Sequence, residues 1–354
     1  MNGWDYNMAN TPRIDRLENN KIINGNFDFW QRGTSLSIGP TDQAYLADRW
    51  KVVGPGSSAI VTASRSASVP TFAESGFQSA YSHDINVTTA DVSASNYYLS
   101  YRLEGYDLQP IHKKKVTLSF WIYATKTGTS CVTFNNSADD RGYPVEFTID
   151  SSNTWEKKSI TIDLDQNGTW LLDAGIGLGI RFILNNAVAQ QGTADVWQSG
   201  AIYGTSNQIN HLDTIGNRYR IAQVILNEGE VAGSFSRAGR TISEELQMCQ
   251  RYYEKSYDLD VIAGAITSIG RHCYQASNTT FHREEVSYKI YKRAAASIIV
   301  YGHQSGATDV AQRDSGVPTT MGNIVSGEKG FTVQGASQTA NGEYSFHWTA
   351  DAEL

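Results

Sequence analysis

The sequence predicts a mainly β protein: an antiparallel β-sandwich of jelly-roll type, followed by a linker helix and a smaller C-terminal β domain. Three observations predict this fold. Apolar and polar residues alternate in many short runs, and 31 glycines help to separate these runs. The composition is 11% aromatic but only 18% charged, which is typical neither of a disordered chain nor of a coiled coil. At 354 residues, the chain is long enough for about two domains.

Residues 1–20 show no hydrophobic period and carry only isolated apolar anchors. A segment of this kind is ordered only when it lies on another surface. We therefore expect an N-terminal arm that docks on the rest of a larger assembly. Its candidate docking residues are Trp4, Tyr6, Ile14 and Leu17.

Residues 21–240 are assigned to the sandwich, because their strongest signal is a period of two. In each such run, every second residue is apolar and therefore lies on one face of a strand. No helical pattern separates the runs, so two antiparallel sheets packed through their apolar faces are the simplest way to bury them. The clearest runs are 97–103, 116–122, 145–149, 160–164 and 176–184.

At residue 241 the period changes from two to that of a helix. Thr241 and Glu244 have the spacing of a capping box, which begins a helix. Apolar residues then recur every three or four positions, which predicts a linker helix over 241–257, of roughly four turns. Residues 258–354 contain further strand patterns, interrupted by a polar loop at 302–327, and we assign them to a small C-terminal β domain.

Composition excludes several classes of partner and location. The formal net charge of −7 and the pI near 5.5 do not favour nucleic acid or an anionic membrane surface. No stretch approaches about 18 consecutive apolar residues, so no membrane insertion is expected, and no signal peptide is recognisable. Three cysteines without a metal-binding spacing favour free thiols in a protein that folds in a cytoplasm.

No set of residues in the sequence forms a convincing catalytic or metal-binding motif. The seven histidines include neither H-x-H nor H-E-x-x-H, and the acid-plus-His cluster considered is His211 with Asp213, which we expect to be a solvated loop rather than a zinc site. Adjacent acids such as Asp139 and Asp140 face opposite ways on a strand and do not converge on one substrate bond. The sequence therefore predicts a protein that is not an enzyme and has no metal and no cofactor.

A carbohydrate-binding surface is easier to predict, because aromatic rings stack on sugar rings while carboxylates and amides bind hydroxyl groups. Two segments combine these residue types. The long segment 185–212 carries Trp197 and Tyr203 among Asp195 and Asn207, and the loop 135–144 carries Asp139, Asp140 and Tyr143. One alternative stays open for both segments: the aromatic side chains attach the loop to the sandwich, or are buried against a partner subunit.

Several segments also resemble a family of bacteriophage virion proteins, tail-fibre-like or minor structural. The opening IINGNFDFWQRG (22–33) and ADRW (47–50) resemble the start of such proteins, and EELQMCQRYYEKSY (244–257) resembles their linker helix. Two strand segments, SFWIYA (119–124) and TWEKKSITI (154–162), resemble their sandwich, which is similar to the jelly roll of carbohydrate-binding modules. The ending FHWTADAEL (346–354) resembles their C-terminal strand.

This resemblance implies a structural component of a phage particle, assembled in the cytoplasm of the infected bacterium. It implies a homotrimer that contacts other virion proteins through the arm 1–20 and binds host-surface polysaccharide at several weak sites. Because only about twenty residues precede the sandwich, a compact appendage of tail tip, head or collar is expected rather than a complete fibre. Two alternatives are a purely architectural decoration protein and a depolymerase or esterase.

Overall fold

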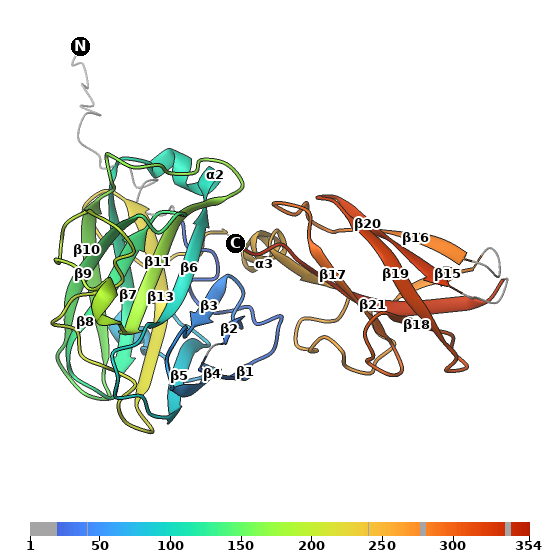
Figure 1. The fold of residues 1–354 in the computed structure, drawn as a ribbon, viewed down its shortest axis with the longest axis horizontal. Coiled ribbons are helices and arrows are strands. Elements are labelled where there is room, and N and C mark those ends of the chain that lie inside the picture. Colours follow the sequence, from blue (N-terminus) through green and yellow to red (C-terminus); the bar gives the residue numbers. More distant parts are fainter. Residues whose placement is uncertain (1–19, 41, 240, 277–280, 337–340) are drawn as a thin grey trace, which may run out of the picture.

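The computed structural model describes residues 20–40, 42–239, 241–276, 281–336 and 341–354. Figure 1 shows two β bodies side by side, with the short helix α3 and the C-terminal residues between them. The larger body contains the N-terminal two thirds of the described chain, and the smaller, elongated body contains the strands from β14 onward. The predicted arm residues Trp4, Tyr6, Ile14 and Leu17 lie outside the described residues.

The larger body is an antiparallel β-sandwich, which confirms the predicted fold class. Its two sheets contain six and seven strands. The six-stranded sheet has the order β1 (Ser35–Ile38), β4 (Ile60–Ser66), β5 (Ser82–Thr89), β13 (Arg218–Glu228), β7 (Lys115–Ala124), β10 (Trp155–Asp163). The seven-stranded sheet has the order β12 (Gln198–Ser199), β9 (Arg141–Ile149), β8 (Gly128–Asn135), β11 (Ile176–Asn185), β6 (Tyr97–Glu104), β3 (Trp50–Val53), β2 (Gln43–Tyr45).

The alternation of apolar residues explains why these strands form a core. Leu99 of β6, Phe120 of β7 and Phe182 of β11 are almost fully buried between the sheets. The Phe120 and Phe182 rings meet edge to face, with centroids 4.9 Å apart. Short helical segments connect the strands at the ends of the sandwich: α1 (Phe72–Ser75), α2 (Gly105–Leu108), and the 3₁₀ turns η3 (Gln109–Ile111) and η4 (Val188–Gln190).

The smaller body is built around the long strand β21 (Glu343–Asp351), and all its ladders are antiparallel. Four strands pair directly with β21: β14 (Tyr253–Lys255), β15 (His272–Gln275), β17 (Ser297–Gly302) and β18 (Val310–Gln312). The sheet continues through β19 (Pro318–Ser326), β20 (Gly330–Ala336) and β16 (Phe281–Ser287). Its core contains Val300, Val333 and Phe346, each with no exposed side-chain surface.

Two sequence predictions for this region are wrong in detail. The helix α3 (Ile242–Gln250) begins at the predicted capping box of Thr241 and Glu244, but it ends well before residue 257. Tyr253 instead opposes Asp351 in the pairing of β14 with β21, so tertiary pairing overrides the helical pattern. The predicted polar loop 302–327 contains the whole of β18 and β19, because neighbouring strands satisfy the backbone hydrogen bonds of these polar residues.

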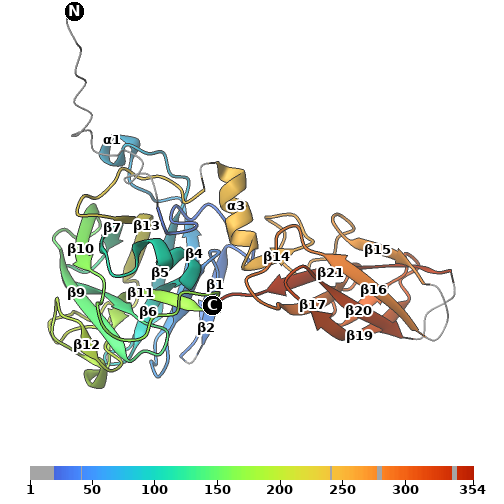
Figure 2. The same cartoon turned by 90° about the horizontal axis from the view of Figure 1, so that it is seen from above.

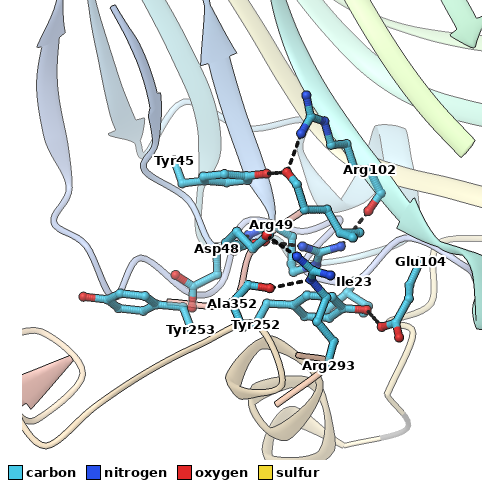
Figure 3. Close-up of polar contacts among 12 residues, drawn as sticks. Ile23, Tyr45, Asp48, Arg49, Arg102, Glu104, Tyr252, Tyr253, Arg293 and Ala352 are labelled. Atoms are coloured by element: carbon cyan, nitrogen blue, oxygen red, sulfur yellow. Dashed lines mark hydrogen bonds and ion pairs between the residues drawn. The ribbon is translucent and has the colours of Figure 1, made fainter. Parts of the chain in front are cut away.

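A buried polar joint connects the two bodies (Figure 3). Arg49 is fully buried and forms an ion pair with Glu353, while Arg32 pairs with Asp351 at 3.0 Å. Arg293 donates from Nη2 to the main-chain oxygen of Glu353 at 2.7 Å. Removing one member of a buried ion pair leaves an uncompensated charge and costs about 3–5 kcal/mol. The residues that follow β21 are therefore held firmly against the sandwich.

The joint brings together four of the six segments on which the sequence resemblance rests. The backbone N–H of Asn24 donates to Glu245 of α3 at 2.5 Å. Gln31 donates from Nε2 to Asp48 at 2.7 Å and to the main-chain oxygen of Tyr253 at 3.1 Å. Four segments that are far apart in sequence, 22–33, 47–50, 244–257 and 346–354, thus meet at one place.

Candidate functional site

The long segment between β11 and β13 is folded tightly against the seven-stranded sheet. Figure 2 shows its short strand β12 at the edge of the sheet, beside β9. There Gln198 opposes Gly142, and the backbone N–H of Asp195 donates to the main-chain oxygen of Pro144 at 2.9 Å. Further along, the N–H of Ile209 donates to the oxygen of Thr129 at 2.9 Å. These bonds place Trp197 and Tyr203 in two different surroundings.

Trp197 belongs to a partly exposed aromatic cluster, which we define as Tyr143, Trp170 and Trp197. The ring centroid of Trp197 lies 5.1 Å from that of Tyr143 and 5.4 Å from that of Trp170. Each ring is half-buried and packs against the margin of the sandwich core. The indole N–H of Trp197 donates to the main-chain oxygen of Asp163 at 2.9 Å, which fixes the ring. The cluster therefore combines a rigid setting with exposed ring surface.

A cavity of about 370 Å³ opens beside the aromatic cluster. Arg141 and Asp165 form a bidentate ion pair on its wall, with Nε–Oδ2 and Nη2–Oδ1 distances of 2.6 and 2.9 Å. The exposed carboxylates of Asp163 and Asp195 add acceptors. The cavity is lined by Arg141, Tyr143, Asp163, Leu164, Asp165, Gln166, Asn167, Asp195, Val196 and Trp197.

The lining of this cavity carries three carboxylates and one guanidinium, so it disfavours anionic ligands. Burial, assisted by Asp195 and Asp163, raises the pKa of Tyr143, so its phenol remains protonated. The hydrogen bond from Arg141 to Asp165 raises the pKa of the guanidinium, which stays charged and engaged by its partner. Aromatic faces beside carboxylate and amide groups suit a sugar, since a sugar ring has both apolar C–H faces and hydroxyl edges.

Tyr203 belongs to a second cluster, the Arg181 cluster, which we define as Tyr98, Asp139, Arg181 and Tyr203. The Arg181 guanidinium lies 4.9 Å from the Tyr98 ring centroid and 4.4 Å from that of Tyr203. Its Nη2 donates to both carboxylate oxygens of Asp139, at 2.8 and 2.7 Å. Burial alone lowers the pKa of Arg181, but Tyr98 and Asp139 outweigh it and the pKa is raised.

The Arg181 cluster attaches the loop to the outer face of the sheet. The Tyr203 ring meets Tyr98 edge to face at 5.6 Å, and the main-chain oxygen of Tyr203 accepts a hydrogen bond from Thr133. Beneath the loop, burial raises the pKa of the Cys131 thiol to about 11, so the thiol is protonated at neutral pH. The contacts of Tyr203 therefore agree with the alternative reading, in which the aromatic side chain attaches the loop to the sandwich.

The remaining predicted site residues lie elsewhere. Asn207 donates to Glu146 at 3.1 Å, on the outer face of the sheet. Asp140 accepts a hydrogen bond from Asn136 at 2.6 Å, within its own loop. The seven candidates are thus divided: Trp197, Tyr143 and Asp195 share one cavity, Tyr203 and Asp139 share Arg181, and Asn207 and Asp140 belong to neither group.

Sequence reasoning missed two residues that organise these clusters. Arg181 is the one charged residue of strand β11, within the apolar run 176–184, and that isolation is a signal that could have identified it. Trp170 lies in a segment without a regular apolar pattern, so its residue type was the one signal in the sequence that it could belong to an aromatic cluster. Its N–H donates to the oxygen of Asn167 at 2.9 Å, and its ring supports Trp197 from one side.

The histidine and acidic groups considered for catalysis or metal binding are engaged by other partners. His211 is buried against Ser130, with 3.2 Å between Nε2 and Oγ, and burial lowers its pKa to about 3. Asp213 forms an ion pair with Lys126. Asp28 of the opening segment pairs with Arg237 at 2.9 Å. Within the described ranges, no group of three or more His, Cys, Asp or Glu side chains has a geometry for holding a metal ion.

Comparisons with known proteins give structural likeness only. No protein-family model matches the chain, and no curated protein matches it. Among solved structures, the enzymatically active domain of tailspike protein 4 of bacteriophage CBA120 is 14% identical, with a TM-score of 0.34; the match covers 60% of this chain and 22% of that one. This chain thus spans less than a quarter of the tailspike domain.

Carbohydrate-binding modules are also similar in fold. The module TmCBM61 in complex with β-1,4-galactotriose is 12% identical with a TM-score of 0.29, and the match covers 59% of this chain and 99% of that one. A family 11 carbohydrate-binding module of a Clostridium thermocellum cellulosomal cellulase is 13% identical with a TM-score of 0.29, covering 56% of this chain and 96% of the module. Sequence identities and TM-scores this low assign no ligand and no activity to this chain.

The structure contains no candidate membrane span: in the part of the chain that is described, no helix is both long and apolar enough to cross a bilayer.

Proposed function

We propose that this chain is a non-enzymatic structural protein of a phage particle that binds host-surface glycan at the cavity beside the aromatic cluster. One observation carries the binding proposal: Trp197 and Asp195 of the long segment after β11 and Tyr143 of strand β9 line one cavity of about 370 Å³. That volume lies in the range of small-ligand sites. The half-exposed rings offer stacking surface, and the Arg141–Asp165 pair, Gln166 and Asp195 offer donors and acceptors at the ring edges.

The virion assignment is supported by the sequence resemblance and by where its segments lie. Four of the six resembling segments form the joint between the two bodies, and the other two lie on β7 and β10 of the sandwich. Most of them therefore specify a fixed arrangement of sandwich and C-terminal domain rather than the cavity. A fixed arrangement suits a component of a particle. In this proposal the chain assembles in the bacterial cytoplasm, forms a homotrimer, and docks on other virion proteins through residues 1–20. Three weak sites on one trimer then bind by avidity.

A titration of the purified full chain against an array of bacterial surface polysaccharides tests the binding proposal. We expect binding by the wild type and at least about a tenfold loss for Trp197→Ala, since a central aromatic anchor commonly contributes 2 kcal/mol or more. Tyr106→Ala is the matched control, because Tyr106 is 53% exposed on α2 and lies outside the cavity. An equal loss in both variants would contradict the assignment of the cavity.

A purely architectural role is the second candidate, and one observation favours it. The N–H groups of Trp197 and Trp170 already have main-chain partners, and Arg141 is paired with Asp165, so these groups are satisfied without a ligand. This role predicts no binding to the array and no competition with phage adsorption. A hydrolytic role predicts release of reducing ends or acetate from host polysaccharide, and we expect neither.

A further inference from the structure

A second, smaller cavity lies on the outer face of the seven-stranded sheet, next to the Arg181 cluster. Its volume is about 30 Å³, and strands β6, β8 and β11 form its floor together with the loop that follows β8. This volume holds one or two groups of the size of a water molecule. The cavity lies apart from the aromatic cluster and shares none of its lining residues. Its wall includes Ser100, Arg102, Asn135, Ser137, Gly179 and Arg181.

Two buried polar atoms of this wall have no hydrogen-bond partner among the described residues: Nη1 of Arg181 and Oδ1 of Asn135. Both residues are 5% exposed. A buried donor or acceptor without a partner costs about 1–3 kcal/mol, so an unpaired donor and an unpaired acceptor around one cavity indicate a bound group that satisfies both.

The hydrogen bonds that Asn135 and Arg181 already make determine which of their atoms can still bind that group. The amide nitrogen of Asn135 donates to the main-chain oxygen of Asn136 at 2.8 Å and to Asp139 at 2.7 Å. The amide can donate only from its nitrogen, so its oxygen is the atom left as an acceptor. Nη2 of Arg181 is held by both oxygens of Asp139, which leaves Nη1 as the donor.

A glycine makes room for the Asn135 amide. A Cβ atom at Gly179 would lie 2.5 Å from Oδ1 of Asn135, so any side chain there would displace the amide or fill the space in front of it. Gly179 lies on β11, two residues before Arg181, and therefore on the same face of the sheet. Strand β11 thus carries both the donor, Arg181, and the glycine on which the acceptor amide packs.

The pair of unpaired atoms selects one kind of ligand group. A hydroxyl group accepts a hydrogen bond from Arg181 and donates one to Asn135, whereas a carboxylate or phosphate cannot donate and an ammonium group cannot accept. We propose that this cavity is a second glycan subsite, which takes a single hydroxyl or hydroxymethyl group of a neutral sugar. The sugar ring stays outside, over Ser100, Ser137 and Arg102, because 30 Å³ does not admit it. This inference rests on the proposed glycan binding but uses a different surface.

Saturation-transfer NMR with the full-length Trp197→Ala variant tests the subsite, because that variant removes the principal binding ring of the first site. The probes are the methyl glycosides of glucose, galactose and mannose, with their 6-deoxy and uronic acid analogues. We expect at least one neutral glycoside to receive saturation, strongest at the protons next to the inserted hydroxyl. Where that hydroxyl is the 6-hydroxyl, the 6-deoxy analogue binds at least tenfold more weakly, and the uronate does not bind.

Two further variants locate the signal. Ser137→Trp, in the Trp197→Ala background, places a bulky side chain at the mouth and is expected to abolish the transfer. Ala138→Trp, at the exposed neighbouring position, is the matched control and is expected to leave the saturation transfer unchanged.

If the wild type binds glycan and Trp197→Ala alone abolishes all transfer, the subsite is refuted and the proposed function stands. If the wild type binds none of the probes or polysaccharides, both fail. A crystal structure with ordered water in the cavity at saturating sugar also refutes the subsite.

Discussion

The aromatic cluster and the Arg181 cluster are built by the same loop, yet they have opposite relations to solvent. Trp197 and Tyr203 are six residues apart. Trp197 stands beside an open cavity, with its N–H satisfied by one main-chain oxygen. Tyr203 covers a buried guanidinium, and its main chain is bonded to the sheet beneath it.

The difference comes from the sheet rather than from the loop. Beneath Tyr203 lies Arg181, a buried charge that requires a carboxylate and ring faces around it, so its surroundings must close. Beside Trp197 the Arg141–Asp165 pair lies at the margin, where water and ligands have access. Whether an aromatic residue of this long loop anchors the loop or offers a binding surface therefore depends on whether it packs on a buried charged side chain of the sheet.

The largest expected effect tests whether the loop as a whole belongs to the fold. His211 closes its C-terminal end, and burial holds its pKa at about 3, against about 6.5 in the unfolded chain. Between these values the unfolded chain takes up a proton that the folded chain does not. Stability is therefore complete above pH 6.5 and falls as the pH drops, by about 1.4 kcal/mol per unit, or ~3 kcal/mol by pH 4.

Denaturant unfolding of the wild type and of His211→Gln at pH 7 and pH 4 measures this effect. Burial also lowers the pKa of His83 to about 3, so the wild type carries two such groups and the variant carries one. We expect the variant to lose ~3 kcal/mol less on acidification than the wild type. An identical loss in both proteins would show that the end of the loop opens without cost.

The second prediction concerns the anchor. Tyr203→Ala removes a half-buried ring from Tyr98 and Arg181, and we expect a loss of about 2 kcal/mol in unfolding free energy. The substitution also uncovers Cys131, which is fully buried beneath the loop. In a Cys273→Ser background, which removes the exposed thiol, labelling by a thiol reagent is expected to become faster. Unchanged labelling would mean that the sheet, and not Tyr203, protects Cys131.

Much of the fold follows from alternation, because a strand with one buried face repeats its pattern every second residue. Leu99, Phe120 and Phe182 were predicted to share the core on that basis, and they do. The end of the helix was not predictable. Tyr253 continues the helical period of the sequence, but in the structure it lies in β14 and pairs with Asp351 of β21. Sequence spacing contains no information about a partner almost one hundred residues away.

The candidate site was predictable in its residue types but not in its grouping. Trp197 and Tyr143 were both identified as sugar-binding residues, and the structure places them 5.1 Å apart. Asp139 and Tyr143 were both assigned to the loop 135–144, yet Tyr143 lies in β9 and Asp139 pairs with Arg181 in the other cluster. Which side of the sheet a loop residue faces depends on the register of β8 with β9, which no local pattern specifies.

The third prediction asks whether a ring that packs on Trp197 without lining the cavity contributes to glycan binding. Trp170 does not line the cavity, but its ring meets Trp197 edge to face at 5.4 Å. Trp170→Ala is expected to weaken glycan binding about fivefold, close to 1 kcal/mol, because Trp197 loses its support. Tyr106→Ala is the comparison, because Tyr106 is exposed and lines neither cavity, and its affinity should stay within about twofold of the wild type. If the two variants weaken binding equally, the ring of Trp170 does not support Trp197.

The smallest expected effect concerns one carboxylate of the cavity. Asp195 has a positive φ of 61°, a conformation that Asn also adopts readily, and its backbone N–H bonds to Pro144. Asp195→Asn therefore leaves the loop unchanged and removes only the charge. We expect unchanged stability and about a twofold weaker affinity for neutral glycan, because an amide oxygen is a weaker acceptor for a sugar hydroxyl than a carboxylate. A tenfold loss, measured by calorimetric titration, would instead mean that the charge itself binds the ligand, and would move the proposed ligand from a neutral to a cationic sugar.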